Sequence, residues 1–244
     1  MLPKNTFPTY QIKLISSGET IEFRPFLVKE QKLLLMASES DDSKSVVNSI
    51  KQILKNCVIT KEINIDKLPI FDLEFLFLNL RARSVNEVVD LNYKCNNKIK
   101  DENGEEKDCT GIEKFSVNLL EIVPEISKTH NKKIMLSEKL GIMMKYPTIE
   151  MLSDVDSNNT GDLIIQLVID CIDYIFDGDE VYYTKDTPKE ELVEFIDTLQ
   201  QKDLEKIKLF FDTAPKIKKH FDFKCKKCGY EEEIDVEGIN NFFV

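Results

Sequence analysis

The sequence predicts an α+β fold with a mostly helical body, an N-terminal β-hairpin and a pair of cysteine knuckles formed by distant segments. Three observations predict it. Apolar residues recur at helical spacing through most of the chain. YQIKLI (10–15) and TIEFRPF (20–26) alternate in polarity on either side of SSGE, as the strands of a hairpin do. LNYKC (91–95) and FDFKC (221–225) both alternate up to an aromatic residue, a lysine and a cysteine, which indicates strands that end at a tight tip.

The two cysteine segments are copies of one hairpin. Counted from Cys109 and from Cys228, Phe115 aligns with Ile234. The same count aligns three further pairs: Ser116 with Asp235, Val117 with Val236, and Leu120 with Ile239. Each copy therefore holds a strand, a cysteine pair and a returning strand.

Four thiols on two such tips match the ligand set of a structural zinc site. Zinc binds four thiolates tetrahedrally at about 2.3 Å, and one knuckle supplies only two. We therefore expect a zinc-ribbon-like Zn²⁺ site with four ligands: Cys95, Cys109, Cys225 and Cys228. The second pair has C-x-x-C spacing, whereas thirteen residues separate the first pair. The alternatives are four reduced cysteines near one another, or a disulfide pair. Redox chemistry is disfavoured because no βαβ unit follows the C-x-x-C.

The segments follow one another in a simple order, and we expect them to form one compact unit. Residues 1–27 hold the N-terminal hairpin, 28–90 a helical region, 91–122 the first cysteine hairpin, 123–215 strands and then helices, and 216–244 the second cysteine hairpin with an apolar tail. The tail, INNFFV, is either a core plug or a docking segment. Helices are expected at 28–40, after Asp42 and at 68–87, and strands near 112–122, 132–136 and 140–145.

A long helix is expected over residues 162–176, because apolar residues recur there at helical spacing. Its polar face would carry Asp170, Asp173 and Asp177, which are either a solvated face or a site for a cation or a basic partner. Cys57 and Cys171 lie on apolar helix faces and are expected in the core.

Composition excludes several classes of function. The 244 residues carry a formal net charge of −11, which disfavours nucleic-acid binding, and the basic runs at 216–220 and 224–227 are expected to be solvated. No apolar run is long enough to span a membrane, and no leader peptide is expected. The chain has two histidines, His130 and His220, and neither lies in a catalytic motif. A site with four thiolate ligands also leaves no open position for water. We therefore expect no enzymatic activity.

Several runs of sequence resemble the baseplate hub proteins of T-even-type contractile-tailed phages. They are LPIFDLEFLFLNLRARSV (68–85), LGIMMKYPTIE (140–150), FFDTAP (210–215) and the closing C-x-x-C-G-Y with a terminal FF. EFRPFLVKEQKLLLMASES (22–40) is similar too, so the resemblance covers almost the whole chain in order. The charged insert between Cys95 and Cys109 departs from the family pattern.

The resemblance implies a late phage protein that helps to build the central hub of the tail baseplate through protein contacts. Its expected partners are the hub proteins and the tape-measure protein. It would be present in the host cytoplasm during assembly and in the virion tail baseplate if it stays in the particle. One alternative is a transient tail-assembly chaperone for the tape-measure and hub complex. A second is a zinc-ribbon module that binds nucleic acid through the basic residues beside Cys225.

Overall fold

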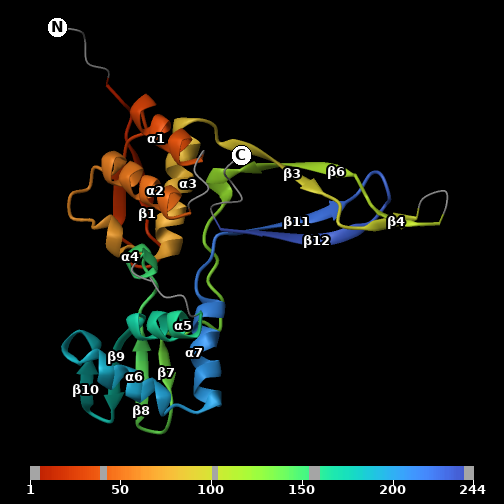
Figure 1. The fold of residues 1–244 in the computed structure, drawn as a ribbon. Coiled ribbons are helices and arrows are strands. Elements are labelled where there is room, and N and C mark those ends of the chain that lie inside the picture. Colours follow the sequence, from red (N-terminus) through yellow and green to blue (C-terminus); the bar gives the residue numbers. More distant parts are fainter. Residues whose placement is uncertain (1–5, 39–42, 101–103, 154–159, 239–244) are drawn as a thin grey trace. The chain divides into compact units, whose positions relative to one another are not determined.

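A computed structural model describes residues 6–38, 43–100, 104–153 and 160–238 (Figure 1). These residues form seven α-helices and twelve β-strands. The chain divides into two compact units, each assembled from separate stretches of sequence. Unit 1 comprises residues 1–63, 74–125 and 216–244, and unit 2 comprises residues 64–73 and 126–215.

The N-terminal part of unit 1 packs a hairpin against helices. Its elements are β1 (Tyr10–Lys13), β2 (Thr20–Phe23), α1 (Val28–Ser38), α2 (Ser43–Cys57) and the part of α3 (Ile70–Ser84) from Glu74 on. The expected hairpin around Gly18 is present, with Ile12 opposite Ile21. Ile21, Ile53 and Leu76 are completely buried. Apolar burial of this kind stabilises the folded state by roughly 25 cal/mol per Å².

The rest of unit 1 consists of the two cysteine hairpins. The first is β3 (Val88–Lys94) with β6 (Ile112–Asn118), the second is β11 (Lys218–Lys224) with β12 (Glu231–Glu237), and a short ribbon of β4 (Lys98–Lys100) and β5 (Glu106–Asp108) occupies the insert. The two expected hairpins are present, and they pair in equivalent registers. Leu91 lies opposite Phe115 in the first, and Phe221 lies opposite Ile234 in the second. These two pairs occupy equivalent places counted from the cysteines.

Unit 2 contains a four-stranded antiparallel sheet in the order β10-β9-β8-β7. Its elements are β7 (Lys133–Met135), β8 (Leu140–Met144), α4 (Ile149–Ser153), α5 (Thr160–Asp170), β9 (Ile172–Asp177), β10 (Glu180–Tyr183), α6 (Lys189–Asp197) and α7 (Gln201–Thr213). Ile142 and Ile172 of the sheet share one buried cluster with Val168, Leu192 and Phe210 of the helices. The helices therefore close the core of unit 2 over the sheet.

The expectation of a mostly helical body is wrong. The described residues contain five separate sheets, and the expected helix over residues 162–176 ends at Asp170. Residues 172–177 instead form β9, which pairs with β8 on one side and β10 on the other. Backbone pairing with β8 and β10 outweighs the local helical spacing of these apolar residues. As a result, Asp173 and Asp177 lie on a strand and do not share a helix face with Asp170.

The sequence contains a turn signal, Gly178-Asp179, directly after the residues 172–177 that form a strand instead of a helix. Gly178 and Asp179 separate two segments rich in β-branched and aromatic residues, as in a two-residue hairpin loop. Gly178 has a φ of 59°, which such a turn requires and which other residues adopt at a cost.

Cys57 and Cys171 are completely buried, as expected. The tail at 239–244 and part of the insert at 101–103 lie outside the described residues. Within the described ranges, every helix is too short or too polar to cross a membrane.

Candidate metal centre

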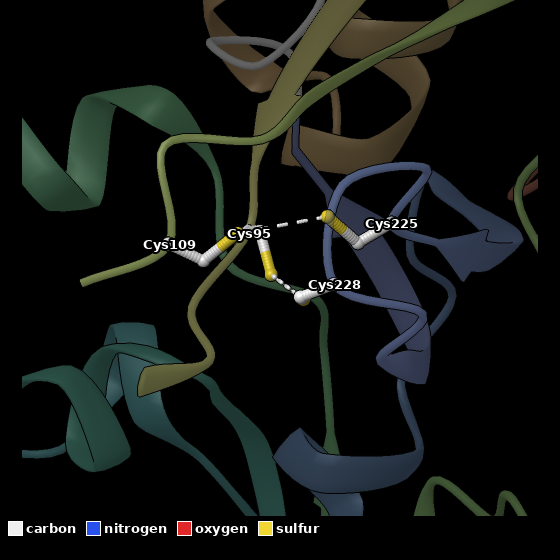
Figure 2. A group of neighbouring side chains, drawn as sticks. All are labelled: Cys95, Cys109, Cys225 and Cys228. Atoms are coloured by element: carbon white, nitrogen blue, oxygen red, sulfur yellow. Dashed lines mark hydrogen bonds between the residues drawn. The ribbon is translucent and has the colours of Figure 1, made fainter. Parts of the chain in front are cut away.

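Each cysteine pair lies where a hairpin of unit 1 reverses direction (Figure 2). Cys95 and Cys225 directly follow β3 and β11. The backbone N–H of Cys95 donates to the carbonyl of Gly111 at 2.8 Å, and that of Cys225 donates to the carbonyl of Tyr230 at 2.8 Å. Gly111 and Tyr230 occupy equivalent places in the two copies. The repeat thus places both cysteines by the same backbone hydrogen bond.

The four sulfur atoms converge from both hairpins. Sγ of Cys95 lies 3.7 Å from Sγ of Cys228, and Sγ of Cys109 lies 3.7 Å from Sγ of Cys225. All four Sγ atoms lie within 4.8 Å of one another, and all four cysteines are free thiols. Four thiolates at about 2.3 Å from a central ion form a tetrahedron with edges of about 3.8 Å. The cluster therefore has the dimensions that Zn²⁺ needs.

Backbone and side-chain N–H groups point at the sulfurs. Asn97 donates its backbone N–H to Sγ of Cys95 at 3.5 Å and its side-chain amide to Sγ of Cys228 at 3.6 Å. The backbone N–H of Gly111 donates to Sγ of Cys109 at 3.4 Å. Such donors stabilise the negative charge that thiolate ligands keep after binding a metal.

The four thiols differ in how easily they ionise. A hydrogen bond from the backbone N–H of Tyr230 lowers the pKa of Cys228 to about 6. Burial raises the pKa of Cys95 to about 12. Metal binding would therefore displace a proton from at least one of the four thiols, because the metal ligand is the thiolate.

A carboxylate supports the second knuckle from the first hairpin. Glu113 on β6 is 8% exposed. Its carboxylate accepts a hydrogen bond from the backbone N–H of Lys226 at 2.9 Å. The other oxygen of Glu113 lies 2.7 Å from Nζ of Lys226. Sequence reasoning missed this contact because its two residues are 113 positions apart.

An aromatic cluster lies behind the cysteines. The ring of Tyr93 contacts Phe223 at a centroid distance of 5.0 Å, and Phe115 contacts Phe221 at 4.9 Å. Phe223 is 1% exposed. These rings belong to the same apolar cluster as the cysteines, and their contacts join the two hairpins.

The two histidines lie apart from the cysteine cluster. His130 lies in unit 2, between the hydroxyls of Thr213 and Tyr146 at 3.0 Å each, and its burial lowers its pKa. His220 lies on β11, where a hydrogen bond to Asp235 raises its pKa. His220, Asp222 and Glu233 also lie close enough to share a cation, but all three are exposed.

Two of the three lysines around Cys225 have acidic partners, and the third, Lys227, donates to the hydroxyl of Thr110. Lys226 pairs with Glu113, and Lys224 pairs with Glu231. At the other end of the hairpin, Lys218 lies 2.7 Å from Asp235. Much of the local positive charge is therefore neutralised within the protein.

Comparison with known protein families finds a match, which covers almost the whole sequence. The family model described as T4 bacteriophage base plate protein matches residues 7–244. No curated protein and no solved structure matches the chain.

Proposed function

This chain belongs to the T4 bacteriophage base plate protein family, and on that premise we propose that it is a non-enzymatic component or assembly factor of the baseplate hub. It acts through protein–protein contacts, and a structural Zn²⁺ ion holds its two cysteine hairpins together. Its partners are other hub proteins and the tape-measure protein. It functions in the host cytoplasm during assembly and, if it is a component of the finished hub, in the virion tail baseplate.

The observation that carries the proposal is the convergence of four sulfurs from two distant hairpins. Cys95, Cys109, Cys225 and Cys228 would fill the tetrahedral coordination sphere of a Zn²⁺ ion, which would leave no position for water or substrate. Such a closed site is structural. A structural role suits a protein whose family builds a baseplate.

The metal would stabilise the fold by closing a long loop. The sulfur pairs join residues that are 116 and 133 positions apart. Holding such distant segments together costs chain entropy, which rises slowly with loop length. Because the unfolded chain has no preformed site, metal binding and folding of the hairpins are coupled.

Zinc content tests the metal site directly. Protein purified under reducing conditions should contain one zinc ion per chain, measured by plasma mass spectrometry. The variants Cys225→Ser and Cys228→Ser should lose it. Cys57→Ala is the matched control, because it removes a buried thiol outside the cluster and should retain zinc. Wild-type protein without zinc, or a Cys225→Ser/Cys228→Ser double variant that keeps it, would refute the site.

A census of intact phage particles tests the hub role separately. Quantitative mass spectrometry should find the chain at a fixed, small number of copies relative to known tail proteins. Absence from particles, together with co-purification with hub intermediates, would favour the transient chaperone. Absence from both would contradict any role in the hub.

Binding of nucleic acid is the weaker alternative. Three of the lysines that a zinc-ribbon module would use, Lys226, Lys224 and Lys218, are paired with Glu113, Glu231 and Asp235. Phosphates would have to displace these carboxylates, and the net charge of −11 opposes their approach. Salt-sensitive binding of the purified protein to DNA or RNA would reverse this ranking.

A further inference from the structure

Strand β10 forms one edge of the unit 2 sheet (Figure 1). It carries exposed apolar and aromatic side chains. The side chains of Val181, Tyr182 and Tyr183 are 46%, 48% and 47% exposed. Because successive side chains of a strand point to opposite faces, both faces of the sheet are exposed at this edge. Tyrosines are enriched where proteins contact one another, because they bury a large ring and also offer a hydroxyl. Three such residues in a row are unusual for a solvent-facing edge, which is normally short and charged.

The backbone of β10 is open on the side away from β9. Asp177 and Glu180 pair across the two-residue loop, so the alternation of an antiparallel ladder turns the N–H and C=O groups of Val181 and Tyr183 outward. Consistent with this, the carbonyl of Tyr183 accepts the hydroxyl of Thr187 at 2.9 Å. In the part of the chain that the structure describes, the other three outward groups make no backbone hydrogen bond.

The surroundings of β10 are strongly acidic. Residues 172–191 contain seven exposed carboxylates and two exposed lysines, a net charge of −5 by this count. The carboxylates belong to Asp173, Asp177, Asp179, Glu180, Asp186, Glu190 and Glu191. Within the described ranges, these seven carboxylates form no ion pair. An unpaired acidic rim around exposed aromatic side chains attracts a basic partner and repels an acidic one.

We propose that β10 is a docking edge, to which another protein adds an extended segment rich in lysine or arginine. The segment would extend the sheet through the outward backbone groups of Val181 and Tyr183. Its apolar residues would cover the tyrosines, and its cations would meet the acidic rim. Unit 2 contains none of the four clustered cysteines, so this proposal stands or falls independently of the zinc site.

Val181→Pro tests the backbone contact. Proline removes an N–H that the β9 ladder does not use, so the hairpin should persist while strand addition is blocked. Val181→Ala is the matched control, because it shortens the side chain and keeps the N–H. The probe is a short synthetic peptide that alternates valine with lysine, and a counterpart with glutamate in place of lysine serves for comparison.

The lysine peptide should bind the wild-type protein and Val181→Ala, measured by fluorescence anisotropy. Val181→Pro should weaken it by about tenfold or more, a loss typical of removing a well-made contact. The glutamate peptide should bind the wild-type protein no more tightly than the lysine peptide binds Val181→Pro. Equal binding of both peptides, no binding of the lysine peptide, or equal binding by the two Val181 variants would overturn the proposal.

A charge variant covers the case in which Val181→Pro fails to fold. Asp179→Lys/Glu180→Lys should weaken the lysine peptide, and Glu205→Lys, exposed on α7, should not. A photo-crosslinking residue at Tyr182 then identifies the partner segment in infected cells by mass spectrometry. A crosslink to a basic segment of another protein supports the proposal. A crosslink to an acidic segment, to a second copy of this chain, or to nothing would overturn it.

Discussion

Glu113 holds the turn between Cys225 and Cys228 by accepting the backbone N–H of Lys226 at 2.9 Å. Its second oxygen lies 2.7 Å from Nζ of the same lysine. The carboxylate is nearly buried, whereas the lysine head is exposed. Two hairpins from distant parts of the sequence are therefore joined beside the sulfur cluster by a polar contact as well as by the sulfurs. The pKa of Glu113 lies below its usual range because Lys226 donates to it.

We predict that Glu113→Ala destabilises the second knuckle more than Lys226→Ala does. The alanine at 113 leaves the backbone N–H of Lys226 without its acceptor, while the alanine at 226 keeps that bond and removes only an exposed ion pair. Thermal unfolding and the rate of zinc loss to a chelator should both rank the variants in this order. Equal effects would show that the ion pair dominates.

We predict that Gly111→Ala disrupts the sulfur cluster. A Cβ at this position would overlap Sγ of Cys225 and lie 3.4 Å from Sγ of Cys109. The sulfur must move, and overpacking of this kind typically costs about 1–3 kcal/mol. The variant should unfold at lower temperature and hold zinc less tightly. Gly104→Ala is the control, because Gly104 has open space around it and a φ of 83°, so the alanine strains the backbone without touching the sulfurs. Its zinc content should match that of the wild type, and an equal loss in both variants would contradict the steric account.

We predict that Gly141→Ala destabilises unit 2. Its Cβ would lie 2.7 Å from the carbonyl oxygen of Ile134 and would overlap the ring of Phe176. Because the carbonyl belongs to the paired strand β7, it cannot move without disturbing the sheet. The free energy of unfolding in urea should fall by about 1–3 kcal/mol. Lys139→Ala, exposed beside β8, should change it little, and comparable losses would argue against the close approach at Gly141.

We predict that His130 makes unit 2 less stable in mild acid. The hydroxyl of Thr213 donates to the carbonyl of Leu209, so its oxygen accepts Nδ1–H of His130, and Nε2 then accepts from Tyr146. This network suits the neutral ring, and burial lowers its pKa below 6.5, with Lys132 adding to the effect. The stability is therefore complete above the unfolded value near 6.5 and is lost as the pH falls towards the folded value.

Unfolding in urea at about pH 7.5 and about pH 5.5 brackets this range. The wild type should lose more stability between the two than His130→Gln, which cannot titrate. Both proteins retain His220, so the difference between them isolates His130. An identical pH dependence would contradict the assignment.

Local patterns in the sequence determined several parts of this protein. The alternation around Gly18 predicted the first hairpin, and the repeat predicted that both cysteine segments are hairpins of the same kind. It also predicted that four particular cysteines come together, as the structure places them, while their binding of zinc stays a prediction. Such features are predictable because strand alternation and tight turns depend on neighbouring residues.

Tertiary structure alone decided the rest. Residues 172–177 have apolar spacing that suits a helix, but pairing with β8 and β10 makes them a strand. The contact of Glu113 with Lys226 and the close approach at Gly111 depend on segments more than a hundred positions apart. The division into two units likewise follows from contacts between separate stretches of chain. In each case the deciding energy comes from non-local partners, which local propensity does not encode.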